Sequence, residues 1–173
     1  MICKCGNEFE PIKRNGIIVS KICVSCVIKK AKTARKKTWS VEKRKRKLEL
    51  KTKSEWLKDL QTVFNTYIRE RDKNKPCISC GRVLPRKYDA GHYFSVGAYP
   101  NLRFKELNVH GQCVECNQHK HGNIQEYIIN LPNRIGQDAF NELLSMRKEQ
   151  LKLTIPEIKE LIIKYKNMTK NML

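Results

Sequence analysis

Eight cysteines in four close pairs constrain the fold of this chain more than any other feature of its sequence. The pairs are Cys3/Cys5, Cys23/Cys26, Cys77/Cys80 and Cys113/Cys116. Two residues separate the cysteines in each of the last three pairs, and at this spacing both thiolates can point at one metal ion. A secreted protein would use such cysteines for disulfides, but thiolates persist in a reducing cytosol, where zinc is the usual ion. We therefore favour zinc binding over disulfide bonding.

The third and fourth pairs form a CxxC…CxxC set with 32 residues between the pairs. This pattern predicts one tetrahedral zinc ion with four thiolate ligands, Cys77, Cys80, Cys113 and Cys116. Four protein ligands leave no open position, so the ion would be structural rather than catalytic. It would clamp the ends of a segment that is too small to form its own core, and would supply much of that segment's folding free energy.

The first and second pairs predict a small zinc ribbon or knuckle over residues 1–28, with Cys3, Cys5, Cys23 and Cys26 as its ligands. A short hairpin would join the pairs, with Gly16 in its turn and the sequence IIVS as a strand. One pair has a single residue between its cysteines, which is a less common spacing for zinc. We therefore expect one or two structural zinc ions per chain.

The charge of the chain predicts a polyanionic partner. Its 173 residues, enough for one ordinary domain or two small ones, include 36 Lys or Arg against 17 Asp or Glu, a net charge of +19. Such an excess draws polyanions, of which nucleic acid is the first choice and an acidic membrane surface the alternative. No run of about eighteen apolar residues is present, which argues against a transmembrane helix. The N-terminal sequence MICKCGNEFE lacks the apolar core of a signal peptide, so a cytoplasmic location is expected.

Residues 29–53 carry much of this charge, with thirteen Lys or Arg and two Glu in 25 residues. One interpretation is a solvated, partly disordered linker. The other is a basic arm that neutralises DNA phosphates and so makes binding depend steeply on salt. The two interpretations are compatible, because a flexible arm can still bind DNA. We assign residues 29–72 to a basic linker and a long basic helix.

Helical periodicity is clearest over residues 54–72, which Ser54 could cap. Pro76 then stops helical continuation. Apolar residues on one face of this helix predict a core stripe, formed by Leu57, Leu60, Phe64, Tyr67 and Ile68.

The C-terminal part of the chain, residues 136–173, is also predicted to be helical. One amphipathic helix is expected over residues 136–150 and another over residues 154–168. Thr154 and Glu157 have the spacing of a capping box at the start of the second helix. Short strands and several helices together predict an α+β fold.

All four histidines of the chain fall within thirty residues, beside the second cysteine set. Phosphodiester hydrolysis needs a base that deprotonates water, and neutral histidine is well matched to that task near pH 7. It also needs a divalent ion, with oxygen ligands, that neutralises charge on the phosphate. Asp89, His92 and Asn117 supply such a set. If Asn117 begins a helix, His121 lies one turn further on the same face and could join the metal.

The order His92, Asn108 and then CVECNQHK resembles the HNH nuclease motif, in which a β-hairpin and a helix surround one divalent ion. Asn108 matches the middle asparagine of the motif, and Asn117 matches its last position. The wider string AGHYFSVGAYPNLRF…NVHGQCVECNQHKHGN is more similar still to the NinG/Rap family of phage recombination endonucleases. The N-terminal cysteines, the basic stretch and NRIGQDAF after the motif fit the same family.

This resemblance implies a zinc-clamped ββα-metal (HNH) core over residues 73–135. It also implies a role for each residue of the motif. His92 would be the general base that activates water. Asn117 would be a ligand of a catalytic Mg²⁺ or Mn²⁺ ion. Asn108 would hold the hairpin loop and orient His92.

The sequence departs from the HNH pattern directly before the first histidine of the motif. Many HNH nucleases have an acidic metal ligand at this position, which is Gly91 here. Asp89 is the nearest carboxylate, and we weigh metal ligation evenly against a role as a turn residue. His119, His121 or His110 could supply the missing ligand, although a loop position near the zinc knuckle is the favoured interpretation for His110.

The resemblance further implies a metal-dependent DNA endonuclease that acts on branched DNA, such as Holliday junctions and displacement loops, during phage recombination in the host cytoplasm. A homodimer would suit symmetric cutting of a four-way junction, although the sequence itself gives no clear dimer signal. The alternative is a non-catalytic zinc-finger protein that binds DNA or RNA, which would need none of His92, Asn108 and Asn117 at motif spacing. A mobile-element homing nuclease with a long target sequence is a third hypothesis.

Overall fold

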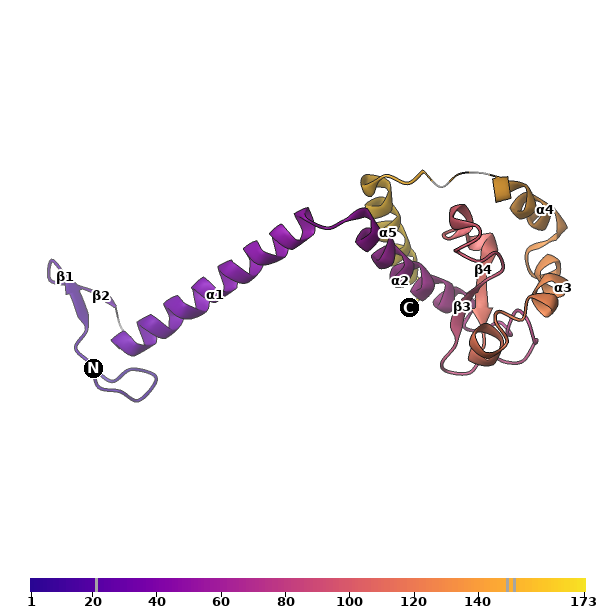
Figure 1. Ribbon diagram of the computed structural model, residues 1–173. Coiled ribbons are helices and arrows are strands. Elements are labelled where there is room, and N and C mark those ends of the chain that lie inside the picture. The colour runs from indigo at the N-terminus through magenta and orange to yellow at the C-terminus, as the bar shows by residue number, and fades with distance from the viewer. Residues whose placement is uncertain (21, 149, 151) are drawn as a thin grey trace. The chain divides into compact units, whose positions relative to one another are not determined.

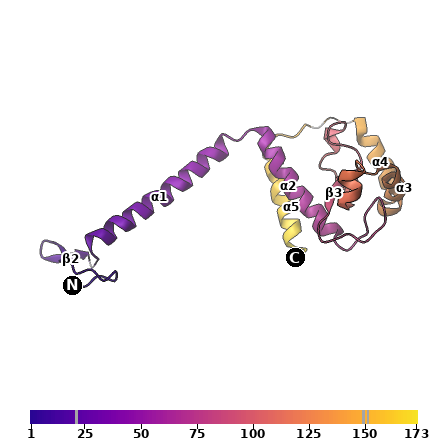
Figure 2. The same cartoon turned by 60° about the horizontal axis from the view of Figure 1, so that its bottom comes forward.

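The computed structural model describes residues 1–20, 22–148, 150 and 152–173, and is shown in two orientations in Figure 1 and Figure 2. The chain divides into two units, Met1–Lys51 and Thr52–Leu173. Both units combine helices with a two-stranded sheet, so the predicted α+β class is confirmed.

The first unit begins with a small antiparallel hairpin of β1 (Ile12–Arg14) and β2 (Ile17–Ser20). Asn15 and Gly16 form its two-residue turn, with φ angles of 50° and 79°. Positive φ at both central residues is the geometry that suits the right-handed twist of a hairpin, and asparagine and glycine adopt it most easily. The predicted turn at Gly16 and the predicted strand IIVS are therefore confirmed.

Most of the basic segment belongs to α1 (Val24–Glu49), a helix of 26 residues. The interpretation of residues 29–53 as a partly disordered linker is therefore wrong for all but their last few residues. Lysine and arginine are good helix formers, and residues 24–49 contain no glycine or proline to interrupt them. None of the described side chains of α1 is buried. Despite this length, none of the helices in the described part of the chain is apolar enough to cross a membrane.

The second unit opens with α2 (Lys53–Asp72), which is capped by Thr52 rather than by the predicted Ser54. The Thr52 hydroxyl accepts a hydrogen bond from the Glu55 amide, and the Glu55 carboxylate accepts one from the Thr52 amide. This reciprocal capping box needs Glu or Gln three residues after the cap. Ser54 lacks that partner because Leu57 occupies the position, which explains the earlier start.

The core of the second unit is built where α2 packs against α5 (Ile155–Lys170), and the two helices lie side by side in both views. The predicted stripe on α2 faces this core, because Leu60, Phe64, Tyr67 and Ile68 are buried. The predicted capping box of Thr154 and Glu157 is present at the start of α5. The Phe64 ring lies edge-on to Tyr165 of α5, with 4.9 Å between ring centroids.

A second hairpin, β3 (Asp89–His92) with β4 (Val109–Gln112), lies against α2. The strands are antiparallel, with Asp89 opposite Gln112 and His92 opposite Val109. The connection between them contains two short 3-10 turns, η1 (Pro100–Leu102) and η2 (Glu106–Asn108). The elements that follow β4 are η3 (Glu115–His119), α3 (Ile124–Ile135), α4 (Gln137–Ser145) and η4 (Met146–Lys148).

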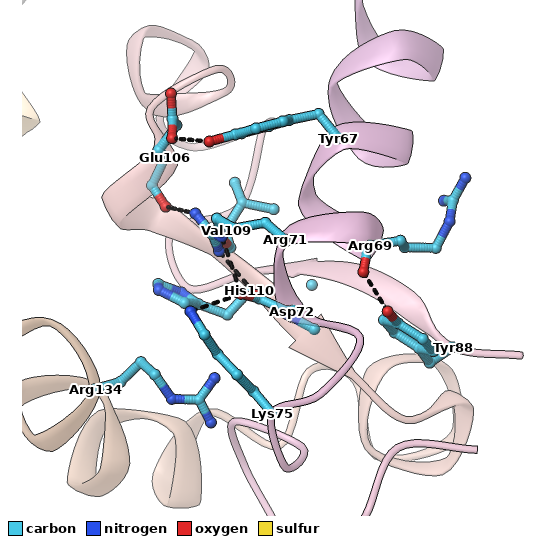
Figure 3. Close-up of polar contacts among 12 residues, drawn as sticks. Tyr67, Arg69, Arg71, Asp72, Lys75, Tyr88, Glu106, Val109, His110 and Arg134 are labelled. Atoms are coloured by element: carbon cyan, nitrogen blue, oxygen red, sulfur yellow. Dashed lines mark hydrogen bonds and ion pairs between the residues drawn. The ribbon is translucent and has the colours of Figure 1, made fainter. Parts of the chain in front are cut away.

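The last turn of α2 is fastened to β4 by the buried carboxylate of Asp72 (Figure 3). Asp72 pairs with Arg71 at 2.8 Å and with Lys75 at 3.2 Å, and accepts a hydrogen bond from the Gly111 amide at 2.8 Å. Burial alone would raise the pKa of Asp72, but the hydrogen bonds and charge of Arg71 hold it at about 2. Arg71 also donates to the Val109 carbonyl at 2.7 Å. These charge-assisted bonds fix the position of the hairpin relative to α2.

Candidate active site and metal centres

The second cysteine set gathers as the sequence predicted. The sulfur atoms of Cys77, Cys80, Cys113 and Cys116 all lie within 4.8 Å of one another. The Sγ of Cys113 is 3.8 Å from those of both Cys77 and Cys80. Tetrahedral zinc with Zn–S bonds of ~2.3 Å requires sulfur atoms about 3.8 Å apart, whereas a disulfide requires ~2.05 Å. These four residues therefore fit a closed zinc site and not a pair of disulfides.

The backbone turn and the N–H donors around this cluster favour ionised cysteine side chains. Gly81 has a φ of 69°, which lets the chain turn back so that its amide donates to the Cys77 carbonyl at 3.0 Å. The Cys113 amide points at the Cys77 sulfur at 3.4 Å. Burial opposes ionisation of Cys80, but hydrogen bonds from Arg82 help to hold the pKa of Cys80 at about 6. Donors aimed at sulfur favour the charged form that zinc binds.

The first cysteine set also gathers, in the first unit. The sulfur atoms of Cys3 and Cys26 are 3.7 Å apart, and those of Cys5 and Cys23 are 3.5 Å apart. Cys23 occupies the N-cap position of α1 and Cys26 lies in its first turn, so a zinc ion here would join the N-terminal loop to the helix. The structure thus provides two clusters that can hold zinc, at the positions that the sequence predicts.

An open hollow of about 730 Å³ brings three of the predicted site residues together. His92 comes from the end of β3, Asn117 from η3, and His121 from the segment that follows η3. The hypothesis that Asn117 begins a helix is wrong. It lies in the middle of one π-helical turn, and His121 lies beyond that turn with a φ of 48°. His121 nevertheless lines the same hollow. Its own positive φ turns the chain after η3 away from the path that a continuing helix would take.

His92 is held in one tautomer by the backbone of Arg103. Its Nε2 lies 3.0 Å from the Arg103 carbonyl, and because a carbonyl only accepts, Nε2 carries the proton. The lone pair is then on Nδ1, as a general base requires. Burial lowers the pKa of His92 below its usual 6.5, so the ring is neutral at pH 7.

Asn108 is fully buried and holds the loop between the two strands. Its side chain accepts from the Phe94 amide at 2.7 Å and donates to the carbonyls of Phe94 at 3.0 Å and Leu102 at 3.1 Å. One side chain thus fixes both ends of the segment that leads from His92 to Arg103. This geometry supports the predicted role of Asn108 as a residue that positions His92.

Asp89 lies in β3, so the alternative interpretation of Asp89 as a turn residue is wrong. Its Oδ2 accepts hydrogen bonds from Asn117 Nδ2 at 2.9 Å and from Gln118 Nε2 at 2.8 Å. Asp89 is not among the residues that line the hollow, whereas Ala90 and His92 are, because alternate residues of a strand face opposite sides. The bond to Asp89 uses the Asn117 amide nitrogen and leaves its oxygen Oδ1 for another partner.

The two remaining histidines do not line the hollow. His110 lies in β4 and is 2% exposed, so its interpretation as a loop residue is wrong. Its Nδ1 is 3.2 Å from the Tyr127 hydroxyl, which in turn donates to the Gly91 carbonyl at 3.1 Å. Burial lowers the pKa of His110 to about 3, so it is a neutral core residue. His119 is exposed at the end of η3.

Gly91, where many HNH nucleases have a carboxylate, has no room for any side chain. A Cβ atom there would lie 2.1 Å from Oε1 and 3.0 Å from Cβ of Gln112. Gln112 is fully buried and donates to Ser79 at 2.6 Å and to the Gly122 carbonyl at 2.5 Å, so it cannot move aside easily. Packing on β4 therefore explains the departure from the motif.

Replacing Gly91 by alanine is expected to lower the free energy of unfolding of the second unit by about 1–3 kcal/mol, the usual cost of overpacking. Gly97 provides a matched control, because a Cβ there meets nothing within 4 Å. Urea unfolding of both variants measures the difference. Equal stability of Gly91→Ala and Gly97→Ala would contradict the packing shown here.

The wall of the hollow opposite η3 was not anticipated from the sequence. Arg103 donates through Nε to Gln61 of α2 at 2.6 Å, and Gln61 donates to Asn65 at 2.6 Å. All three residues line the hollow. Gln61 and Asn65 are polar residues of α2 that flank its core stripe, and no sequence signal distinguishes them from ordinary half-buried polar residues. Arg103 stands in the motif-like string PNLRF, which was its one available signal.

Comparison with known proteins decides the family. The family model described as "Bacteriophage Lambda NinG protein" matches residues 1–173. The chain belongs to the NinG family. Its NinG relatives include the proteins named "Protein ninG" of Escherichia phage 933W, Escherichia phage lambda and Salmonella phage P22. Each is 46% identical over 127 residues, which cover 73% of this chain and 62–63% of the relative.

The matched region therefore spans less than two thirds of the length of these NinG proteins. No solved structure matches the chain. The family assignment thus rests on sequence similarity, which agrees with the resemblance found in the motif strings.

Proposed function

We propose that this NinG-family protein is a metal-dependent DNA endonuclease with an HNH, ββα-metal core formed by β3, β4 and η3. The observation that carries the proposal is one hollow lined both by a neutral, oriented imidazole and by an asparagine held by a carboxylate. This combination is not needed by a protein that only binds nucleic acid. The net charge of +19 supplies the affinity for a polyanionic substrate.

His92 acts as the general base. With its Nε2 proton donated to the Arg103 carbonyl, Nδ1 accepts a proton from a water molecule that attacks the scissile phosphorus. The lowered pKa of His92 keeps this nitrogen free at neutral pH. Asn108 is a positioning residue, because it holds the loop on which Arg103 lies.

The described residues that line the hollow offer a Mg²⁺ or Mn²⁺ ion two candidate ligands and no carboxylate, so such an ion would keep several water ligands. Asn117 offers Oδ1 and His121 offers an imidazole, and such ions use few protein ligands together with phosphate oxygens. When bound, the ion neutralises charge on the phosphate and on the leaving oxygen. Asp89 orients Asn117 rather than lining the site itself.

Arg103 binds the scissile phosphate. Its Nε is held by Gln61, and the two terminal nitrogens of the guanidinium remain for the paired oxygens of a phosphate. Gln61 is itself held by Asn65, so α2 sets the direction of the guanidinium. The same residue therefore contributes its carbonyl to His92 and its side chain to the substrate.

The resemblance to the NinG/Rap recombination endonucleases favours branched DNA, such as Holliday junctions and displacement loops, as the substrate in phage recombination. A nicking assay tests the proposal with supercoiled plasmid, a synthetic four-way junction and a linear duplex of the same sequence, with and without Mg²⁺ or Mn²⁺. Metal-dependent cleavage that is faster on the junction is expected. Absence of cleavage under all of these conditions would refute the enzyme assignment.

A non-catalytic zinc protein that binds nucleic acid is the second candidate function. Among the described residues, only the two four-cysteine sets bring three or more His, Cys, Asp or Glu side chains close enough for one ion. This candidate predicts salt-dependent binding without metal-dependent cleavage. The same nicking assay therefore separates the two candidates.

Arg103→Ala is expected to lower cleavage about tenfold to a thousandfold, because the transition state loses a charged donor. Arg103→Lys keeps the positive charge but loses the paired N–H donors of the guanidinium, so it should recover cleavage only in part. Arg86→Ala serves as the control, because Arg86 is exposed and does not line the hollow. Single-turnover cleavage rates measure all three variants. If Arg103→Ala cleaves like the Arg86 control, Arg103 does not bind the reacting phosphate.

A further inference from the structure

The long helix α1 has an apolar stripe that the described chain leaves largely exposed. The stripe repeats at alternating intervals of three and four residues, and its apolar members are Val24, Val27, Ala31, Ala34, Val41 and Leu48. Thr38 and Lys45 occupy the two remaining positions of the repeat. No side chain of α1 is buried, and Val41 and Leu48 are 66% and 48% exposed. A strict repeat of 3.5 residues is the pattern of a two-stranded coiled coil.

The charges that flank the stripe indicate what covers it. Glu42 and Glu49 are the only acidic residues of α1, and they lie seven positions apart beside the stripe. Lys37 and Arg44 occupy the equivalent positions on its other side. In a parallel pair of α1 helices, Lys37 of one copy faces Glu42 of the other, and Arg44 faces Glu49.

An antiparallel pair is disfavoured by the same charges. It would bring the basic side of the stripe, with Lys30, Lys37 and Arg44, against the same basic side of the partner. The ion pairs found among the described residues engage neither Glu42 nor Glu49, so both carboxylates are available for another chain.

We propose that two copies of this chain associate through a parallel coiled coil of their α1 helices. The side of α1 opposite the stripe carries Lys29, Lys36 and Lys43, which remain exposed in the pair and free to contact DNA phosphates. Two features weaken the pair of helices. Lys45 lies within the apolar stripe, and Lys30 of one copy faces Arg35 of the other. Lysine in the seam lowers stability while fixing register, so the dimer dissociates in a measurable concentration range.

The test is sedimentation equilibrium of the zinc-loaded full chain at physiological salt, without DNA, combined with charge exchange. Wild-type protein should show a concentration-dependent monomer–dimer equilibrium. Glu42→Lys with Glu49→Lys, and separately Lys37→Glu with Arg44→Glu, should each weaken dimerisation about tenfold or more, because every flanking pair becomes repulsive. The variant with all four exchanges restores the pairs and has the wild-type net charge, so it should dimerise like the wild type.

The Lys37→Glu, Arg44→Glu variant separates specific pairing from general repulsion. It lowers the net charge of α1, so a dimer limited only by overall repulsion would become tighter, whereas the paired arrangement becomes weaker. Tighter association of this variant, or a wild-type protein that stays monomeric at every concentration, would overturn the proposal. Circular dichroism of each variant verifies that α1 remains helical. Cleavage is not measured, so the outcome is independent of the nuclease assignment.

Discussion

Replacing His92 by alanine is expected to lower DNA cleavage about a hundredfold to ten-thousandfold, the usual contribution of a general base. Zinc content and DNA affinity should stay at wild-type levels, because the ring of His92 bonds to the Arg103 carbonyl and not to a cysteine, and is neutral at pH 7. Single-turnover cleavage, zinc analysis and fluorescence anisotropy with labelled DNA measure the three quantities.

His119→Ala is the matched control for this experiment. His119 lies at the end of η3, is exposed and does not line the hollow, so its loss should leave the cleavage rate within about twofold of the wild type. Undiminished cleavage by His92→Ala would show that another group deprotonates the water. Equal losses in both variants would point to a general effect on folding.

The pH dependence of wild-type cleavage adds an independent check on His92. In the proposed mechanism the neutral imidazole is the active form, and burial lowers its pKa below 6.5. As the pH falls, the base therefore stays neutral past 6.5, and the rate declines only at the lower pKa of the folded protein. If the cleavage rate instead falls on the acid side with a midpoint above pH 6.5, the buried environment of His92 is contradicted.

Loss of the second zinc site is expected to have the largest effect on stability. Structural zinc contributes on the order of 10 kcal/mol to small zinc domains, and the whole stability of a domain is about 5–15 kcal/mol. Cys113→Ser removes one of the four ligands and should abolish the cooperative unfolding transition of the second unit. Its zinc content should fall from two ions per chain to one, and cleavage should fall with it.

Cys3→Ser provides the comparison, because it removes a ligand of the other cluster. It should also lower the zinc content to one ion per chain, but the second unit should keep its unfolding transition. Zinc analysis with thermal denaturation separates the two variants. A folded second unit in Cys113→Ser would show that this cluster does not support its fold.

The features of the fold that sequence reasoning anticipated are those with a local physical signature. Cysteine spacing identified both clusters, since two cysteines that lie close along the chain can point both thiolates at one ion. Apolar periodicity placed the core stripe of α2, and the capping box at Thr154 placed the start of α5. The cap of α2 lies at Thr52, two residues before the predicted Ser54, because Glu55 completes a capping box with Thr52 and Leu57 cannot do so with Ser54.

The features that sequence reasoning missed depend on contacts between distant segments. Gln61 and Arg103 are 42 residues apart, and only the packing of α2 beside the hairpin brings them together. Sequence reasoning placed Asp89 and Asn117 at one site, but as ligands of one ion and not as hydrogen-bond partners, because that contact depends on where η3 turns. Contacts between distant segments leave no periodic pattern in the sequence. The sequence therefore predicted His92, Asn117 and His121 in the hollow, but not Gln61 and Arg103.

The direct succession of Cys116 and Asn117 couples the zinc scaffold to the hollow through a single peptide bond. No spacer lies between them that could absorb a local disturbance. Oxidation of Cys116 would release its sulfur from a zinc ion held by this cluster, and the resulting displacement would reach Asn117 through that one peptide bond. In the proposed nuclease, such oxidation is therefore expected to lower cleavage without modifying any residue that lines the hollow.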